Sequence, residues 1–319
     1  MKRPVEKSDG SLPSSPVPAD VLASAGLVAD ASWRRRLADY GELAKVRLSL
    51  LVIFVTAAGF CLGARGPVDI LGLIHVLIGT SLVAFAANAL NQVIERDHDR
   101  LMRRTADRPL PAGRISPAQA TAFGFVLAAV GIAQLSTLTN LLAASLAAAT
   151  FLLYLLIYTP LKRRTPLNTL IGAVPGAIPP MIGYAAAAGT LNVTAWILFA
   201  VLFLWQLPHF FAIAWLYRED YARGGYKMLS VVDPSGRAIS RQTIAFTILL
   251  LVCSLLPAWL GIVQQAYPFG ASLLGGALLF VAIRFVQDRN RSSARVLLLA
   301  SIAYLPLLTM LLVLTHIAR

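Results

Sequence analysis

"LIHVLIGTSLVAFAANAL", residues 73–90, decides the fold class, because no position in this run carries an ionised side chain. A helix that crosses a bilayer needs about 20 predominantly apolar residues. The chain continues with "NQVIERDHDRLMRRTADRPLPAGR", residues 91–114, in which Glu95, Asp97 and Asp99 fall within five positions and are followed by several arginines. An apolar run that changes this abruptly predicts a helix that crosses a membrane and ends at its surface.

The whole chain shares this character. It has 319 residues, of which 57% are hydrophobic and 13% charged, and its mean hydropathy is +0.70. Soluble domains carry about 25% charged residues, and a membrane β-barrel would show alternating segments of about 10 residues. The fold class is therefore predicted to be an all-α polytopic membrane protein, a bundle of nine transmembrane helices. The nine apolar windows lie at about 48–64, 70–93, 117–137, 140–159, 168–188, 194–216, 242–263, 268–287 and 295–316.

The domain organisation follows from composition. Residues 1–31 are rich in Ser, Pro and Ala and are predicted to form a disordered cytoplasmic tail, and residues 32–319 are predicted to form a single transmembrane domain. Residues 32–47 have the pattern of a short amphipathic helix on the membrane surface. No apolar run follows Met1, so we expect no secretory signal. The two cysteines, Cys61 and Cys253, sit in apolar runs and are interpreted as packing residues.

The basic residues set the expected orientation. With nine spans, every Lys and Arg except Arg65 and Arg319 falls on the N-terminal side of the membrane. This distribution predicts a cytoplasmic N-terminus and explains the net charge of +13 without a nucleic-acid partner. We expect a bacterial cell (inner) membrane, with the mitochondrial inner membrane as the alternative, because the N-terminus lacks the Arg- and Ser-rich pattern of a transit peptide.

The first candidate motif ends the second apolar run. Asn91, Glu95 and Asp99 recur every four residues, so on a helix they share one face. All three offer oxygen ligands, and Mg²⁺ takes oxygen ligands while it bridges to substrate phosphates. We predict a metal site here; the alternative is a set of ordinary salt bridges. Asp97 and His98 lie off this face and are expected to be solvated.

Basic side chains accompany this motif. Arg104 and Arg108 lie in the following Pro- and Gly-containing loop, Lys162 lies after the fourth window, and Lys227 lies in a second glycine-containing loop. Arginine binds phosphate in a bidentate way, and lysine binds it as a point charge. We therefore predict that basic residues here bind phosphate groups. The alternative is that they only fix the orientation of the chain.

A second candidate motif spans residues 205–230, "WQLPHFFAIAWLYREDYARGGYKMLS". On one continuous helix, His209 would lie two to three turns below Asp220 on the same stripe. Pro208 frees a backbone carbonyl, which a membrane tolerates where a cavity or a neighbour satisfies it. A catalytic His209 competes with a structural, hydrogen-bonded one. Residues 170–184, "LIGAVPGAIPPMIGY", predict either a kinked, closely packed helix or a helix bent around a substrate chamber.

Together the two motifs resemble the UbiA-type intramembrane prenyltransferases, and most closely their haem-farnesylating branch. The first motif is similar to the family's "NxxxDxxxD…RT…RPL", and "WQLPHF…W…REDYxRGGYKMLS" and "YTPLKRRTPLNTLIGAVPGAIPPMIGY" are similar to that branch. The likeness covers about residues 40–316. The chain departs from the pattern in two places: Glu95 stands where Asp is commoner, and Gly224 stands where related enzymes carry another carboxylate. The second departure argues for one Mg²⁺ rather than two.

The resemblance implies that the nine transmembrane helices surround a central cavity and that the protein is an Mg²⁺-dependent prenyltransferase. It implies transfer of the farnesyl group of farnesyl diphosphate to the vinyl group of haem b, with addition of water, to give haem O and diphosphate for haem-copper oxidases. The implied metal ligands are Asn91, Glu95 and Asp99, and the implied catalytic set adds Asp220 and His209. The implied diphosphate ligands are Arg104, Arg108, Lys162 and Lys227. The implied partners are the two substrates and the lipid bilayer, together with a homo-oligomer or a complex with a haem A synthase.

Three other functions stay open at this point. A prenyltransferase acting on a phenolic ring shares the first motif, but it carries a second DxxxD that this chain lacks. A transporter or channel would place carboxylates near the bilayer midplane and show inverted repeats. A haem-binding assembly factor fits the composition but gives no reason for a metal and diphosphate set.

Overall fold

The computed structural model describes residues 33–317, and the expected tail at residues 1–31 lies outside them. The chain divides between Tyr40 and Gly41 into two units. Residues 33–40, the described part of the first unit, are helical, as predicted for the segment 32–47. Every helix of membrane-spanning length among the described residues belongs to the second unit.

Within residues 33–317, nine segments are helical, long and apolar enough to cross a membrane, which confirms the predicted fold class and span count. Apart from an isolated bridge between Val263 and His316, the described residues form no β-structure. The bounds are α2 (Val46–Gly63), α3 (Ile70–Asp99), α4 (Pro117–Leu138), α5 (Leu141–Leu152), π-helix η1 (Leu153–Tyr158), α6 (Thr159–Leu161), α7 (Asn168–Ala177), α8 (Pro179–Ala188), α9 (Val193–Leu216), α10 (Arg218–Arg223), α11 (Leu229–Val232), α12 (Arg237–Trp259), α13 (Tyr267–Asp288) and α14 (Arg291–Thr315).

Local sequence signals set several helix starts. Ser116 forms a capping box with Gln119 and precedes Pro117, so α4 begins where its first free amide groups find a partner. Asn140 and Asn192 cap α5 and α9 by accepting from backbone amides within the first turn. These caps fix where the chain re-enters the apolar layer.

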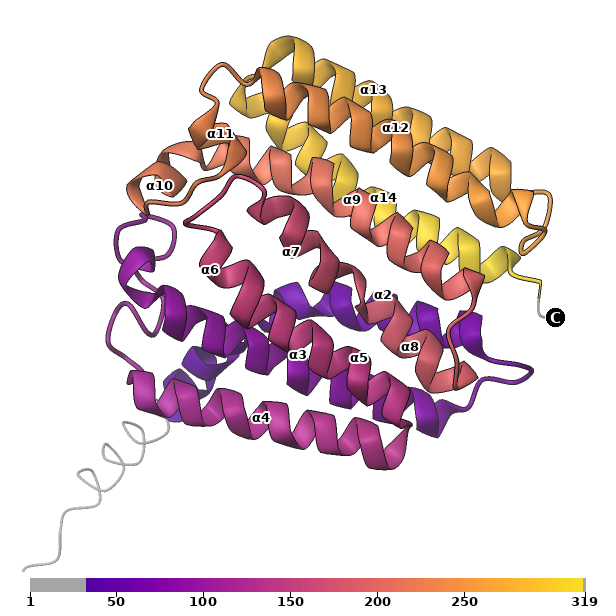
Figure 1. Cartoon of the computed structure of the whole chain (residues 1–319), viewed down its shortest axis with the longest axis horizontal. Coiled ribbons are helices and arrows are strands. Elements are labelled where there is room, and N and C mark those ends of the chain that lie inside the picture. Colours follow the sequence, from indigo (N-terminus) through magenta and orange to yellow (C-terminus); the bar gives the residue numbers. More distant parts are fainter. Residues whose placement is uncertain (1–32, 318–319) are drawn as a thin grey trace, which may run out of the picture. The chain divides into compact units, whose positions relative to one another are not determined.

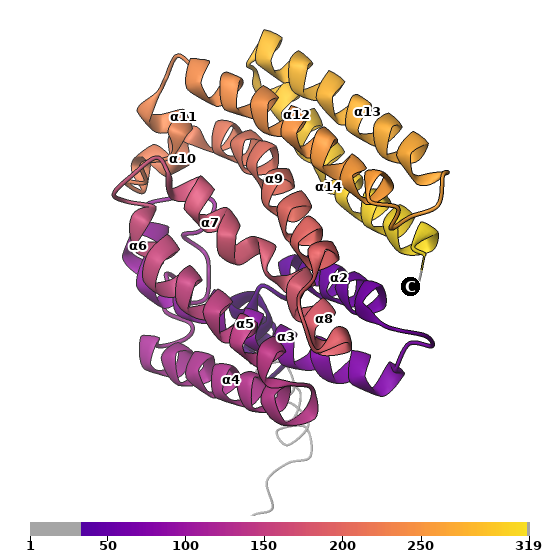
Figure 2. The ribbon, with the colours of Figure 1, turned by 45° about the vertical axis from the view of Figure 1, so that its right-hand side comes forward.

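Two sets of three helices pack together in the bundle (Figures 1 and 2). One group holds α3, α4 and α5, and the other holds α12, α13 and α14. Helix α9 packs against α7 on one side and against α12 and α14 on the other. The buried side chains correspondingly form two clusters, one around α9 and α14 and one around α3 and α5.

Helices α2 and α8 approach each other at backbone distance. A Cβ added to Gly59 would collide with the carbonyl oxygen of Pro180, and one added to Gly183 would collide with that of Thr56. Small residues permit this closeness in membrane helix pairs. The fifth span also breaks at Ile178 between α7 and α8, so the prediction of a kinked, closely packed segment is confirmed.

Candidate active site

Helix α3 continues past the apolar run to Asp99, as predicted, and it carries the first motif into a cavity of about 220 Å³. Asn91, Glu95 and Asp99 all line this cavity and are only 1%, 7% and 1% exposed. The spacing of four residues therefore does place three oxygen-bearing side chains on one buried face. The other residues lining the cavity are Lys45, Leu48, Met102, Arg104, Arg108, Tyr158, Lys162, Thr169, Phe210, Ile213, Tyr221, Tyr226 and Met228.

Each carboxylate of the motif faces a basic side chain. The Lys162 Nζ lies 2.9 Å from the Glu95 Oε1, and an Nη1 of Arg108 lies 2.8 Å from the Asp99 Oδ2. Asn91 donates its Nδ2 to the Thr159 hydroxyl at 3.0 Å, which leaves its amide oxygen for another partner. Two of the three predicted diphosphate ligands in this cavity are thus already paired with the two predicted metal-binding carboxylates.

The donor set fits Mg²⁺. Two carboxylates and an amide oxygen at one cavity wall are ligands for a hard cation that keeps several waters and completes its shell with substrate phosphates. Residues 33–317 hold no group of three or more His, Cys, Asp or Glu side chains arranged to bind a metal without such help. The cavity therefore offers two carboxylates and an amide as possible oxygen ligands for Mg²⁺.

Arg104 and Lys162 both lie over aromatic rings, and Lys162 is also held by its ion pair with Glu95. The Arg104 guanidinium lies 4.8 Å from the ring centroid of Tyr217 and also reaches Tyr221, and the Lys162 ammonium lies 4.5 Å from that of Tyr158. Burial disfavours the charged form of Lys162, but the ion pair with Glu95 outweighs it and raises the lysine pKa well above its ordinary value. Lys162 therefore remains a fixed positive charge.

Lys45 is a cavity residue that neither sequence motif indicated. It stands immediately before α2 with a left-handed backbone (φ 51°), and its side chain lines the cavity. Burial, together with the nearby charges of Arg108 and Lys162, lowers its pKa from 10.5 to about 7. Its position directly before the first apolar run was the available signal.

The second motif is not the single stripe that was predicted. Helix α9 ends at Leu216, Tyr217 leaves the helical conformation (φ −112°, ψ 23°), and α10 begins anew at Arg218. The expectation that His209 and Asp220 share one helix face is therefore wrong. Instead, the cavity is reached from this segment by Phe210 and Ile213 of α9 and by Tyr221, Tyr226 and Met228 beyond it.

The remaining predicted residues lie outside the cavity wall. His209 stacks on Trp205 and shares a 2.9 Å hydrogen bond between its Nδ1 and the Ser301 hydroxyl of α14. Asp220 pairs with Arg223. The Lys227 backbone donates to the Lys162 carbonyl at 2.9 Å, and its own carbonyl accepts from Asn168. The charged and amide groups that do line the cavity, predicted or newly found, are Lys45, Asn91, Glu95, Asp99, Arg104, Arg108 and Lys162.

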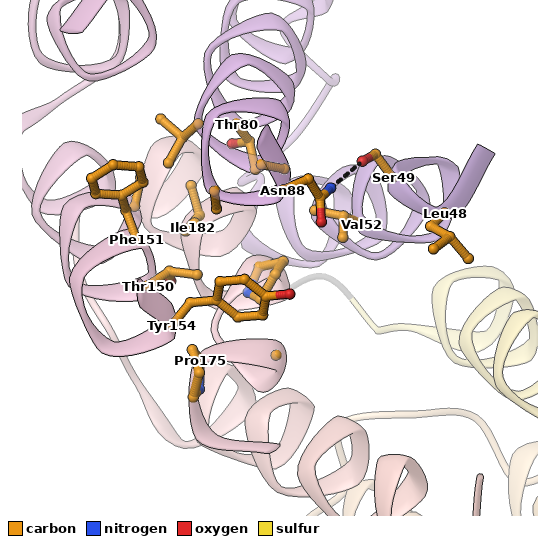
Figure 3. A pocket seen from close by; sticks show the side chains of 16 residues that line it. Leu48, Ser49, Val52, Thr80, Asn88, Thr150, Phe151, Tyr154, Pro175 and Ile182 are labelled. Atoms are coloured by element: carbon orange, nitrogen blue, oxygen red, sulfur yellow. Dashed lines mark hydrogen bonds between the residues drawn. The ribbon is translucent and has the colours of Figure 1, made fainter. Parts of the chain in front are cut away.

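A second, apolar cavity of about 180 Å³ adjoins the first. Leu48 lines both, and Tyr154 and Tyr158, one turn apart on η1, line the apolar and the charged cavity respectively. Figure 3 shows Asn88 of α3, bonded to Ser49, and Tyr154 facing the same space, with Thr80, Phe151 and Ile182 further along it. Pro175, Gly176 and Pro179 contribute the wall at the break in the fifth span, so the bent helix does border a cavity, and a substrate chamber at this place stays a prediction.

Of the two residues expected to be solvated, only one is. The Asp97 side chain is 72% exposed. His98 is half-buried: its Nδ1 lies 3.0 Å from the Gly224 carbonyl oxygen and its Nε2 lies 2.7 Å from an Nη1 of Arg163. The prediction for His98 was wrong because segments distant in sequence fold over it.

The sequence profile of the UbiA prenyltransferase family matches residues 51–312, a stretch that contains most of the residues lining both cavities. This chain belongs to the UbiA prenyltransferase family. A protoheme IX farnesyltransferase from Solibacter usitatus is 47% identical over 279 residues, which are 85% of this chain and 96% of that protein. Among solved structures, a digeranylgeranylglyceryl phosphate synthase superposes with a TM-score of 0.74 at 20% identity, covering 88% of this chain and 98% of that one.

A second solved structure also shares this fold. A UbiA homologue from Archaeoglobus fulgidus, bound to DMAPP and Mg²⁺, superposes with a TM-score of 0.61 at 12% identity, covering 83% of this chain and 98% of that one. At this identity the similarity supports the fold.

Proposed function

We propose that this membrane protein transfers the farnesyl group of farnesyl diphosphate to a vinyl group of haem b, with addition of water, to give haem O and diphosphate. The observation that carries the proposal is the junction at Leu48. There a cavity lined by two carboxylates and several basic side chains meets an apolar cavity, which matches a substrate with a diphosphate head and an isoprenoid tail. The similarity to the protoheme IX farnesyltransferase from Solibacter usitatus supports the choice of substrates.

Asn91, Glu95 and Asp99 would hold Mg²⁺ against the diphosphate through their side-chain oxygens. Mg²⁺, when bound, supplies positive charge that stabilises the departing diphosphate. Arg104, Arg108 and Lys162, joined by Lys45, would donate to the remaining phosphate oxygens. Charges fixed in advance in a cavity of low water content are worth several kcal/mol at the transition state.

The reaction requires no covalent attachment to the protein. The bond between farnesyl C1 and the diphosphate oxygen breaks, and the diphosphate leaves with the electron pair. The allylic cation forms a carbon–carbon bond with the haem vinyl group, water adds to the new cation beside the ring, and the released proton passes to the diphosphate. The apolar cavity keeps water away from the first cation, and Tyr158, Tyr221 and Phe210 offer flat surfaces to a macrocycle.

His209, Asp220 and Lys227 remain proposed site residues, but each needs a change in the site to reach a substrate. We infer that Lys227 reaches the diphosphate, and Asp220 the reacting groups, only if residues 218–227 move toward the cavity when substrate binds. A role for His209 in orienting haem or accepting a proton requires the macrocycle to extend past Phe210, its neighbour on α9.

We further propose that residues 1–31 are a cytoplasmic tail and residues 32–319 one domain in a bacterial cell membrane. Support comes from the asymmetry of Lys and Arg between the two ends of the spans. Labelling of single cysteines placed at Gly113 and Gly66, in loops at opposite ends of α3, tests the orientation. Co-purification from membranes tests a homo-oligomer and a complex with a haem A synthase.

The deciding experiment incubates detergent-purified protein with haem b, farnesyl diphosphate and Mg²⁺ and examines the extracted haem by mass spectrometry. A mass gain of one farnesyl group plus water, lost with EDTA and in Asp99→Asn, supports the proposal. Asp97→Asn is the matched control, because Asp97 is exposed and does not line the cavity. Unchanged haem, with prenylation of an added phenol instead, would overturn the choice of acceptor, and no release of diphosphate with any acceptor would overturn the reaction.

A further inference from the structure

His98 lies where three segments of the chain meet at the end of α3. Its Nδ1 is 3.0 Å from the carbonyl oxygen of Gly224, which follows α10, and its Nε2 is 2.7 Å from an Nη1 of Arg163, which follows α6. Its ring also packs against Tyr226, with 5.9 Å between the ring centroids. His98 itself precedes the loop that carries Arg104 and Arg108.

The partners fix how the imidazole is protonated. A carbonyl oxygen only accepts, so Nδ1 must carry the hydrogen that is donated to Gly224. A guanidinium only donates, so Nε2 must be the bare nitrogen that accepts from Arg163. The neutral ring with hydrogen on Nδ1 satisfies both contacts at once, and no other side chain at this position offers the same pair in a rigid ring.

Each of the three segments contributes a wall of the charged cavity. The first carries Arg104 and Arg108, the second carries Lys162 next to Arg163, and the third carries Tyr221, Tyr226 and Met228. Other contacts join them two at a time: the Lys227 amide donates to the Lys162 carbonyl, and an Nη2 of Arg104 lies 3.5 Å from the Tyr221 hydroxyl. His98 connects its own segment to both of the others through a single side chain.

We propose that His98 is a positioning residue that holds these three segments in register, and so sets the spacing of the basic groups that receive the diphosphate. The inference rests on the proposed function for the identity of the ligand, but the three contacts exist without it. His98 does not line the cavity, so it acts through Gly224, Arg163 and Tyr226 rather than by touching substrate.

Two substitutions separate this role from simple packing. His98→Gln keeps one donor and one acceptor at a similar reach, whereas His98→Leu keeps much of the volume and removes both. We expect His98→Leu to lower kcat/KM about tenfold, mainly through KM for farnesyl diphosphate, since misplacement of ligand-binding groups by an ångström weakens catalysis strongly. His98→Gln should stay within about threefold of the unchanged protein. His75→Leu, near the other end of α3, is the matched control and should change neither parameter.

A second readout does not depend on activity. Amide hydrogen exchange followed by mass spectrometry should show faster exchange in residues 162–167 and 217–228 of His98→Leu, with little change in His98→Gln or His75→Leu. Arg163→Gln should show part of the same effect. The double variant His98→Leu/Arg163→Gln should be no worse than His98→Leu alone, because both substitutions remove the same contact.

The outcomes distinguish the two proposals. If the unchanged protein does not farnesylate haem, the proposed function fails, while the exchange measurement still tests His98. The inference on His98 is overturned if His98→Leu matches the unchanged protein in KM and in exchange. It is also overturned if His98→Leu and His98→Gln show the same fall in kcat, the same rise in KM and the same fall in thermal stability, since that pattern indicates a general packing role.

Discussion

The ammonium group of Lys162 lies 2.9 Å from the Glu95 Oε1 in a cavity wall where both side chains are largely buried. The same relationship recurs between Arg108 and Asp99 at 2.8 Å. A buried carboxylate without a partner would be strongly unfavourable, so Lys162 and Arg108 neutralise the two carboxylates that are proposed to bind metal. If the proposed function is right, Glu95 and Asp99 would turn to Mg²⁺ and Lys162 and Arg108 would turn to phosphate oxygens, so that every charged group would keep a partner.

Replacing Lys162 tests this exchange of partners. In Lys162→Gln, Glu95 loses its competing cation, so we expect the affinity for Mg²⁺ alone to rise severalfold. Affinity for a non-reactive farnesyl diphosphate analogue should fall about 10- to 100-fold, because a charge-assisted contact to phosphate is lost. Isothermal titration with each ligand measures both. Arg164→Gln, an exposed basic residue two positions further on, is the control and should change neither. Parallel weakening of both ligands would contradict the exchange.

Lys45 predicts a pH dependence of diphosphate binding. Its pKa of about 7 in the free protein arises first from burial and then from Arg108 and Lys162, while Glu95 and Asp99 oppose the shift. A bound diphosphate favours the charged form, so binding takes up a proton and the affinity should fall as pH rises above about 7. Lys45→Arg should keep its affinity to higher pH, because guanidinium remains charged. Lys45→Met should bind diphosphate weakly at every pH, and its affinity should not fall above pH 7 in the way that Lys45 causes. Because diphosphate itself titrates equally in both experiments, the difference between the two proteins isolates the contribution of Lys45.

The same shift has a consequence for stability. In the unfolded chain the Lys45 pKa returns to 10.5, so between about pH 7 and 10.5 the unfolded state binds the extra proton. Stability should therefore rise with pH across that window in the unchanged protein. Thermal unfolding in detergent at pH 7 and pH 9 measures the rise, and it should be smaller in Lys45→Met. A rise of equal size in both proteins would show that other groups cause it.

The apolar cavity predicts a limit on isoprenoid length. Asn88 and Thr80 of α3 line it about 12 Å apart along the helix axis, and Ala84 lies between them. Ala84→Phe should fill this space and raise KM for farnesyl diphosphate at least tenfold, while KM for dimethylallyl diphosphate changes less, because the shorter tail ends before the new ring. Steady-state kinetics with both donors gives the ratio. Ile78→Phe, on the exposed side of the same helix, is the control. Equal effects on both donors would place the isoprenoid tail elsewhere.

Periodicity in the sequence was sufficient for the spans and for the first motif. An apolar run of about 20 residues has few structural options in a membrane, and a spacing of four residues fixes one face once α3 is known to reach Asp99. Each prediction depends on one helix at a time. The structure confirms the positions of the spans and the shared face of Asn91, Glu95 and Asp99.

Features that depend on several segments were not predictable in this way. The chain turns at Lys45 through a left-handed residue, η1 widens the helix between Tyr154 and Tyr158, and α9 ends at Leu216 although no proline or glycine interrupts the sequence there. In each case the packing of other elements overrides the local preference. His98 shows the same limit, because its partners Arg163 and Gly224 lie 65 and 126 residues away.

The contact between α2 and α8 predicts a sharp effect of a small substitution. A Cβ at Gly183 would overlap the Thr56 carbonyl oxygen, which belongs to the backbone and cannot rotate away. Gly183→Val should therefore separate the two helices and destabilise the protein by about 1–3 kcal/mol or more, the usual range for overpacking. It should also weaken binding of farnesyl diphosphate, because Val52 of α2 and Ile182 of α8 both line the apolar cavity.

Gly276→Ala, in α13, is the control, since its added Cβ meets no atom within 4 Å. Thermal unfolding and ligand titration in the same detergent measure both effects. A Gly183→Val protein with unchanged stability would show that the backbones of α2 and α8 do not need this close approach.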